Sequence, residues 1–187
     1  MADQNIRRRR SRGLRTARSG FTLLEIAITI AILIIAVAST SAATVSLSAM
    51  RRLNRERSVA HNAASALSER ILSLGRSEIG SPGSWARNVA ESVCPPNTLG
   101  VAFDVPELEP QTGFAHVGSI TFLSDETRTD SQLGVQLGMP RDLDGNGFID
   151  GTNVIATARL LPVIIELRWT GIRGDQRLVH PFLVVGY

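Results

Sequence analysis

The residues best suited to bind an ion lie in one short loop, "DLDGNGFIDGTN" at residues 142–153. Oxygen-bearing side chains alternate along its first half, and a glycine follows them where the chain must turn sharply. Alternate side-chain oxygens can wrap a hard divalent cation such as calcium at about 2.3–2.6 Å. The candidate ligands are Asp142, Asp144, Asn146, the backbone carbonyl of Phe148, Asp150 and Asn153.

The spacing of this loop resembles the calcium loops of EF-hand and dockerin-type sequences. It departs from them at the twelfth position, where Asn153 offers one neutral oxygen in place of a carboxylate. Fewer charges and fewer ligand atoms predict weak binding, with a dissociation constant on the order of 10⁻⁴–10⁻³ M. A turn rich in Asp and Asn that needs no ion has the same composition. A weak calcium site and an ion-free turn therefore both stay open.

A different carboxylate, Glu25, stands alone in an apolar run. It is the only ionisable side chain from Phe21 to Ala49. A helix rises 1.5 Å per residue, so about twenty such residues span a hydrocarbon core of roughly 30 Å. The arginine-rich flank before the run should stay cytoplasmic, so the chain after the run faces outward. A charge in lipid costs about 2.5–3.5 kcal/mol at a helix centre, and less near an end. The presence of a carboxylate at position 25 therefore requires an explanation.

Two ordinary interpretations leave Glu25 unexplained. A secretory signal peptide would have a basic start, an apolar stretch at residues 26–38 and the small residues "STSAA" for cleavage. A signal anchor would need only the apolar length. In a third interpretation the chain is cut between Gly20 and Phe21, so that a new amino group begins a helix close to Glu25. The helix dipole favours a carboxylate there, and the carboxylate can neutralise that amine or the amine of a neighbouring subunit.

The stretch "GFTLLEIAITIAILIIAVA", residues 20–38, closely resembles the prepilin processing motif of type IV pilins and type II secretion pseudopilins. In that family a membrane-embedded aspartyl peptidase, the prepilin peptidase, cuts after the glycine and methylates the new N-terminus. The resemblance implies that residues 1–20 are a basic leader that is cleaved after Gly20. It implies that Phe21 is the first mature residue and that Glu25 guides filament assembly. The implied partners are this peptidase, other pilin or pseudopilin subunits, the inner-membrane assembly machinery and membrane lipid.

The helix is expected to continue beyond the apolar run. Neither Pro nor Gly occurs from Phe21 to Leu74, which permits one helix of 54 residues. Residues 21–49 would be its transmembrane and filament-core part, and residues 50–75 an amphipathic spine that Gly75 ends. The apolar stripe of this spine consists of Met50, Leu53, Ala60, Ala64, Leu67, Ile71 and Leu74.

Residues 76–187 are predicted to form a β-rich globular head. A short helix is expected at residues 85–93, and Pro162 is expected to bend or break one strand. An antiparallel sheet whose apolar face covers the spine would satisfy both elements, giving an α+β fold that is also the pilin architecture. The pattern "VIIELRWTGIRGDQRLV" predicts a hairpin and loosely resembles minor subunits of the PilV and GspI type. The strands are expected at residues 99–105, 116–124, 153–169 and 177–187.

The charge distribution argues against a nucleic-acid partner. The net charge is +3, but residues 1–20 carry seven arginines and one acid, so the rest of the chain is acidic overall. If residues 1–20 are cleaved off as a leader, the remaining chain has no net positive charge. A second arginine cluster, at residues 51–57, is interpreted as an interfacial anchor with a solvated helix face, and lipid phosphates or nucleic acid are its other possible ligands. The single cysteine, Cys94, excludes an internal disulfide.

No nucleophile–base–acid pattern, zinc-protease motif or glycine-rich phosphate loop occurs in the sequence, so an enzyme is not expected. The sequence predicts a structural subunit, a minor one, of a type IV pilus or a type II secretion pseudopilus. It would cross the inner membrane once, with its head on the periplasmic side. The alternative is a calcium-dependent extracytoplasmic binding domain that carries a signal peptide or a membrane anchor.

Overall fold

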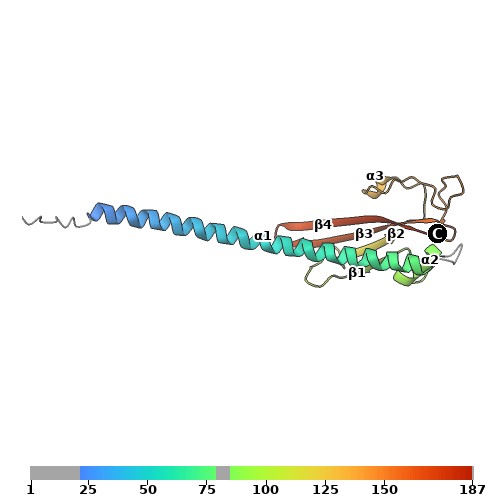
Figure 1. The fold of residues 1–187 in the computed structure, drawn as a ribbon, viewed down its shortest axis with the longest axis horizontal. Helices are drawn as coiled ribbons and strands as arrows, with labels where there is room; N and C mark the ends of the chain where they lie inside the picture. The colour runs from blue at the N-terminus through green and yellow to red at the C-terminus, as the bar shows by residue number, and fades with distance from the viewer. Residues whose placement is uncertain (1–21, 79–84, 187) are drawn as a thin grey trace, which may run out of the picture. The chain divides into compact units, whose positions relative to one another are not determined.

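The computed structural model describes residues 22–78 and 85–186. The predicted α+β class is confirmed, because a long N-terminal apolar helix precedes a small four-stranded antiparallel sheet. The chain divides into two compact units between Ser46 and Leu47. As labelled in Figure 1, the elements are α1 (Leu23–Ser77), α2 (Trp85–Val93), β1 (Gly100–Phe103), β2 (Gly118–Phe122), α3 (Asp130–Leu133), β3 (Leu160–Gly171) and β4 (Gly174–Val185).

The part of α1 from Leu47 onward is the spine of the second unit, the head. One stripe of this part is buried against the sheet, and two alanines at its centre allow the helix and the sheet to approach closely. The predicted stripe is confirmed in its middle, but Met50 is 49% exposed and Ser68, which was not predicted, is buried. The buried residues of α1 are Leu53, Ala60, Ala64, Ser68, Ile71 and Gly75.

Gly75 does not end the helix, so that prediction was wrong. The helix continues to Ser77, and Gly75 lies buried inside its last turns. A Cβ atom at this position would lie 2.5 Å from Cγ1 of Val184 in β4, which is closer than real Cβ contacts allow. Glycine therefore stands here because α1 and β4 touch, although it weakens a helix interior.

The sheet has the order β1-β2-β3-β4, and all neighbouring strands are antiparallel. In β3 the side chains alternate as predicted, because every second residue from Val163 to Trp169 is buried and the residues between them are half-buried. The buried set packs with Ala60, Ala64 and Ile71 of α1 in one apolar core. The buried set is Val163, Ile165, Leu167 and Trp169.

Strand β3 begins later than predicted and passes through Pro162 without a break. Residues 153–159 are irregular, with a turn at residues 155–157, and the strand starts at Leu160. Pairing with β2 begins at Val163, and the carbonyl of Pro162 accepts the N–H of Leu123 just beyond the end of β2. The proline therefore lies where the ladder with β2 ends, so its missing N–H interrupts nothing there.

The other predicted elements of the head are confirmed with small shifts at their ends. Helix α2 has the expected bounds. Strands β1 and β2 are shorter than the runs that predicted them. Strands β3 and β4 form the predicted hairpin, in which Gly171 pairs with Gly174 across a two-residue connection.

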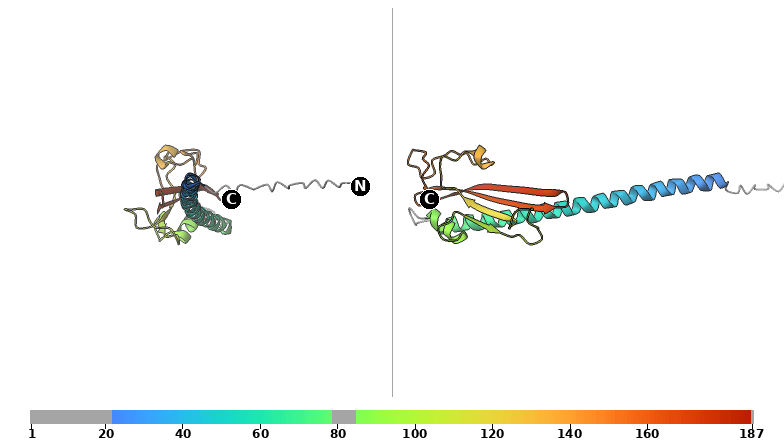
Figure 2. Two further views of the ribbon diagram at one scale, coloured as in Figure 1. Left: turned by 90° about the vertical axis from the view of Figure 1, so that its left-hand side faces the viewer. Right: turned by 180° about the vertical axis from the view of Figure 1, so that it is seen from behind.

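Residues 123–159, between β2 and β3, form an excursion that the sequence did not predict as a unit. It contains α3 and lies on the face of the sheet opposite α1 (Figures 1 and 2). Partly buried residues of that face, Ile164 and Leu183 among them, pack against a second apolar cluster. This cluster consists of Leu123, Leu137, Met139, Leu143 and Val154. The sheet is thus covered on both faces in this region.

Candidate functional site

The predicted processing site lies just before the described part of the chain, since Gly20 and Phe21 are outside the described residues. The description begins at Thr22, whose hydroxyl accepts a hydrogen bond from the N–H of Glu25 at 3.2 Å. The carbonyl of Thr22 accepts the N–H groups of Glu25 and Ile26. Thr22 therefore starts α1 as an N-terminal cap, and Glu25 falls in the first turn, where the helix dipole favours a carboxylate.

The side chain of Glu25 is exposed in the monomer. Within residues 22–78 and 85–186, its carboxylate has neither an ion-pair partner nor a hydrogen-bond partner. An uncompensated charge at the start of an apolar helix can be satisfied by a cation from outside the described residues. The amine of a cut chain and a cation of a second subunit both have the right charge.

The first unit presents an apolar surface along the described part of α1. Every residue from Thr22 to Ser46 is exposed, including a run of isoleucines and leucines. The helix is long and apolar enough to cross a membrane by length and composition. The hydroxyl groups of Thr29, Ser39 and Ser41 donate to carbonyls four residues earlier. These three hydroxyl groups are thereby satisfied within the helix, which suits an apolar surrounding such as lipid or packed helices.

The acidic loop at residues 142–153 is held by hydrogen bonds within itself. Asp142 Oδ1 accepts the N–H of Gly145 at 2.6 Å, and Asp142 Oδ2 accepts the N–H of Gly147 at 2.8 Å. Asp144 Oδ1 accepts the N–H of Asn146 at 3.0 Å. These are Asx turns, in which a short side chain satisfies the backbone two or more residues later. The loop thus has internal hydrogen-bond partners without an ion.

A carboxylate that the sequence did not point to organises this loop. Glu126 is completely buried, and its Oε1 accepts the N–H groups of Leu143 at 2.6 Å and Asp144 at 3.3 Å. Its Oε2 accepts the N–H of Asp150 at 3.2 Å. One buried side chain thereby joins both halves of the loop to the chain that follows β2. Its separation from the loop in sequence explains why no local spacing indicated it.

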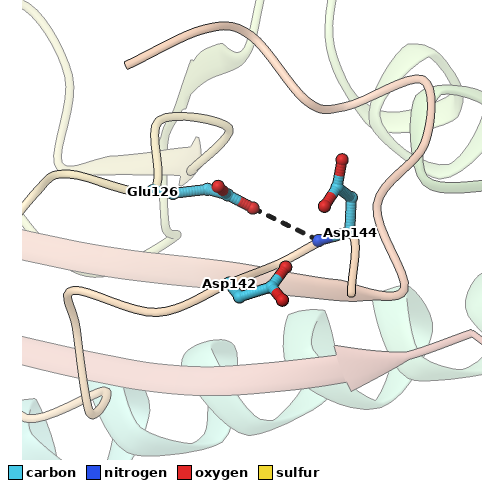
Figure 3. A group of neighbouring side chains, drawn as sticks. All are labelled: Glu126, Asp142 and Asp144. Atoms are coloured by element: carbon cyan, nitrogen blue, oxygen red, sulfur yellow. Dashed lines mark hydrogen bonds between the residues drawn. The ribbon is translucent and has the colours of Figure 1, made fainter. Parts of the chain in front are cut away.

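Glu126 also completes the group of carboxylates that could hold a metal ion in the described part of the chain. One oxygen from each of Glu126, Asp142 and Asp144 lies within 4.8 Å of the other two. Figure 3 shows these three side chains, with the hydrogen bond from the N–H of Asp144 to Glu126 as a dashed line. Three carboxylates at such distances are hard oxygen ligands of the kind that calcium takes.

The structure therefore brings together only part of the predicted ligand set. Asp150 lies outside the three-carboxylate group, and its Oδ1 accepts the N–H and the hydroxyl of Thr152. The side-chain oxygen of Asn146 accepts the N–H of Phe148, and that of Asn153 accepts the N–H of Ile155. The side chains of Asp150, Asn146 and Asn153 thus each serve the local turn in which they stand, and the backbone carbonyl of Phe148 stays a predicted ligand.

Hydrogen bonds lower the pKa of two carboxylates in the loop. The backbone N–H of Gly147 is the main cause for Asp142, and the pKa of that group lies below its ordinary value. The hydroxyl of Thr152 is the main cause for Asp150, followed by the backbone N–H of the same residue. Both groups are charged at neutral pH, so they can serve equally as turn acceptors and as ligands of a cation.

Comparisons with protein-family models, with curated proteins and with solved structures found no match. The functional argument therefore depends on the residues themselves. Two features carry chemistry: an exposed apolar helix with one carboxylate in its first turn, and a carboxylate cluster around a buried glutamate.

Proposed function

We propose that the chain is a structural subunit, a minor one, of a type IV pilus or a type II secretion pseudopilus. The prepilin peptidase cuts it between Gly20 and Phe21, and it assembles through α1. It acts mechanically and not as an enzyme. Before assembly it is held in the inner membrane by its apolar helix, with the head on the periplasmic side.

One observation carries this proposal: Glu25, in the first turn of α1, has no partner for its carboxylate within residues 22–78 and 85–186. It is the only charged side chain in the stretch from Thr22 to Ser48, which is apolar and exposed throughout. An exposed apolar surface of this length is unfavourable in water, and lipid or other apolar helices can bury it. The hydrocarbon of lipid gives the carboxylate no partner. A bundle of identical or related helices gives both the cover and a nearby amine.

The assembly step follows from this pairing. The cut exposes an amino group next to the first turn, and Glu25 neutralises the amine of a neighbouring subunit as the helices leave the membrane. A buried charge pair is costly unless it is complete, so subunits out of register are disfavoured. Apolar contacts along the helices bury the surface that stabilises the bundle. The ion pair sets the axial position of each helix relative to its neighbours.

Mass spectrometry of the protein isolated from its own cells tests the proposal. A mature chain that begins at Phe21 with a methylated amine supports it. A start near Ala42 or Ala43 would support a secretory signal peptide, and an intact leader would support a plain membrane anchor. Either of these two results contradicts the proposed subunit.

A further inference from the structure

The head has a distinct end where α1 enters it. In the second unit, the tip of the β3–β4 hairpin lies beside the first turns of α1 that follow Leu47 (Figures 1 and 2). Gly171 lies so close to the carboxylate of Glu56 that a Cβ atom would collide with it. A hollow of about 410 Å³ is lined by both elements, with Arg52, Arg55 and Ile172 at its wall. We call this end the basal surface; it comprises Arg51, Arg52, Arg55, Arg57, Ile172 and Arg173.

The basal surface is basic, whereas the rest of the head is acidic. All five of its arginines are exposed. Four acids lie near them, and one of these, Glu107, forms an ion pair with Arg55 at 2.9 Å. The others are Glu56, Glu109 and Asp175. The backbone carbonyl of Glu109 accepts the N–H of Thr170 at 3.0 Å, and the carboxylate of Asp175 accepts hydrogen bonds from Gln111 and Thr170. Elsewhere from residue 47 to the C-terminus there are eight arginines and eleven acids. The positive charge of the head is thus concentrated around the residues of α1 that directly follow the apolar run in sequence.

The hairpin tip adds an apolar side chain to this surface. Ile172 is 47% exposed and is followed directly by Arg173. An apolar residue beside arginines suits the boundary between lipid headgroups and hydrocarbon. Along α1, Arg51 to Arg57 rise about 9 Å. The headgroup region of one leaflet is about 5–8 Å thick, so these arginines match its depth if the apolar run before them spans the bilayer.

We propose that the basal surface lies on the membrane before assembly and binds the phosphate groups of anionic phospholipids, with Ile172 in the interface. The inference rests on the proposed function, since it requires the apolar run to be membrane-inserted. It assigns the β3–β4 hairpin a second attachment to the bilayer, separate from α1. Arginine is suited to this task because its guanidinium group binds phosphate oxygens in pairs.

Depth measurements on the full chain in vesicles test the proposal. A nitroxide is attached at Ile172→Cys in a Cys94→Ala background, and its access to oxygen and to a water-soluble nickel complex is recorded. The vesicles contain phosphatidylcholine alone or phosphatidylcholine with phosphatidylglycerol. We expect the label at 172 to lie in the interface in the anionic vesicles and in water in the neutral ones. A label at Phe148→Cys should lie in water in both.

Matched charge variants identify the cause. Arg52→Gln with Arg173→Gln should lower the ratio of docked to undocked heads by about 30-fold in anionic vesicles, given the typical gain per arginine near such a surface. Arg76→Gln with Arg87→Gln removes the same charge at exposed sites near the other end of the spine, with Arg76 about 36 Å along the helix from Arg52, and should change nothing.

A further label, at Ile34→Cys in the apolar run, separates the two proposals. If it lies in hydrocarbon while the label at 172 stays in water in anionic vesicles, the basal surface does not dock and only this inference fails. Equal immersion at 172 in neutral and anionic vesicles would also overturn it, because phosphate charge would then play no part. If the label at 34 lies in water, the membrane-inserted subunit fails and this inference fails with it.

Discussion

The carboxylate of Glu126 accepts a hydrogen bond from the backbone N–H of Leu143 at 2.6 Å, and both residues are completely buried. The same carboxylate accepts N–H groups from both halves of the acidic loop, at Asp144 and at Asp150. A buried charge is tolerated when donors surround it, and here the donors are backbone groups that would otherwise lack partners. Glu126 therefore determines the shape of the loop whether or not an ion binds.

Glu126→Gln should lower the free energy of unfolding of the head by about 2–3 kcal/mol. The amide keeps one acceptor oxygen but turns an NH₂ group towards backbone N–H groups, so charge-assisted bonds are lost and donors face donors. Urea unfolding followed by tryptophan fluorescence in detergent measures the change. Glu91→Gln, at an exposed position on α2, is the matched control and should stay within about 0.5 kcal/mol of the parent. Equal effects of both substitutions would contradict the organising role.

Calcium binding by the loop stays a prediction of the sequence. At a free Ca²⁺ concentration ten times the dissociation constant, we expect a gain in the free energy of unfolding of about 1.4 kcal/mol, seen as a rise in Tm. Asp142→Ala with Asp144→Ala should abolish this calcium-dependent rise, although it also weakens the turn itself. If no rise occurs, or if the rise survives both substitutions, the ion-free turn is the correct interpretation.

Gly75→Ala should destabilise the head by about 1–2 kcal/mol, as expected when a side chain is forced into a packed contact. The sign is informative, because alanine at a free helix position would stabilise by about 1 kcal/mol relative to glycine. The contact with Val184 is the reason for the reversed sign. Val184→Ala removes the clashing methyl groups, so the double variant should be more stable than the sum of the single effects predicts. Urea unfolding measures the free energy of unfolding of the single and double variants. If the two substitutions act additively, the contact between residues 75 and 184 is not the cause of the destabilisation.

The head should lose stability in acid. The pKa of Asp130 is lowered, chiefly by the backbone N–H of Met139. Burial alone would raise the pKa of Glu166, but hydrogen bonds from Arg168 and Arg177 outweigh burial and lower it. A lowered folded-state pKa gives stability that is complete above the unfolded value, about 4, and is lost as the pH falls through the folded value. Unfolding free energy should therefore fall between about pH 5 and pH 2, and Asp130→Asn should weaken this dependence. A flat profile would contradict these hydrogen bonds.

The sequence predicted the elements whose patterns repeat locally. The alternation from Val163 to Trp169 and the apolar stripe around Ala60 and Ala64 depend on one strand and one helix, so their periods are visible in the sequence. Gly75 was misjudged because a glycine that ends a helix and a glycine that permits a contact look alike in sequence. Only the position of Val184 in space separates the two cases.

The candidate site was predictable only in part, for a similar reason. The Asp and Asn residues of the loop were recognised by their spacing, but Glu126 acts on the loop from outside it. Its burial depends on the second apolar cluster, whose members, such as Leu137 and Leu143, show no regular period. Glu25 was recognised at once, because a lone acid in an apolar run conflicts with the cost of charge in lipid.

The most direct test of the account replaces Glu25 by Gln, a substitution that keeps size and removes charge. In cells with the chain's own assembly machinery, filaments are sheared off and the subunit within them is quantified, with mass spectrometry confirming that the variant is still cut before Phe21. Thr29→Val, on the same helix face one turn later, is the control and should assemble normally. We expect the Gln variant to be processed and held in the membrane but reduced at least tenfold in filaments. Parent-level incorporation of a correctly processed Gln variant would contradict the ion pair on which the proposed function depends.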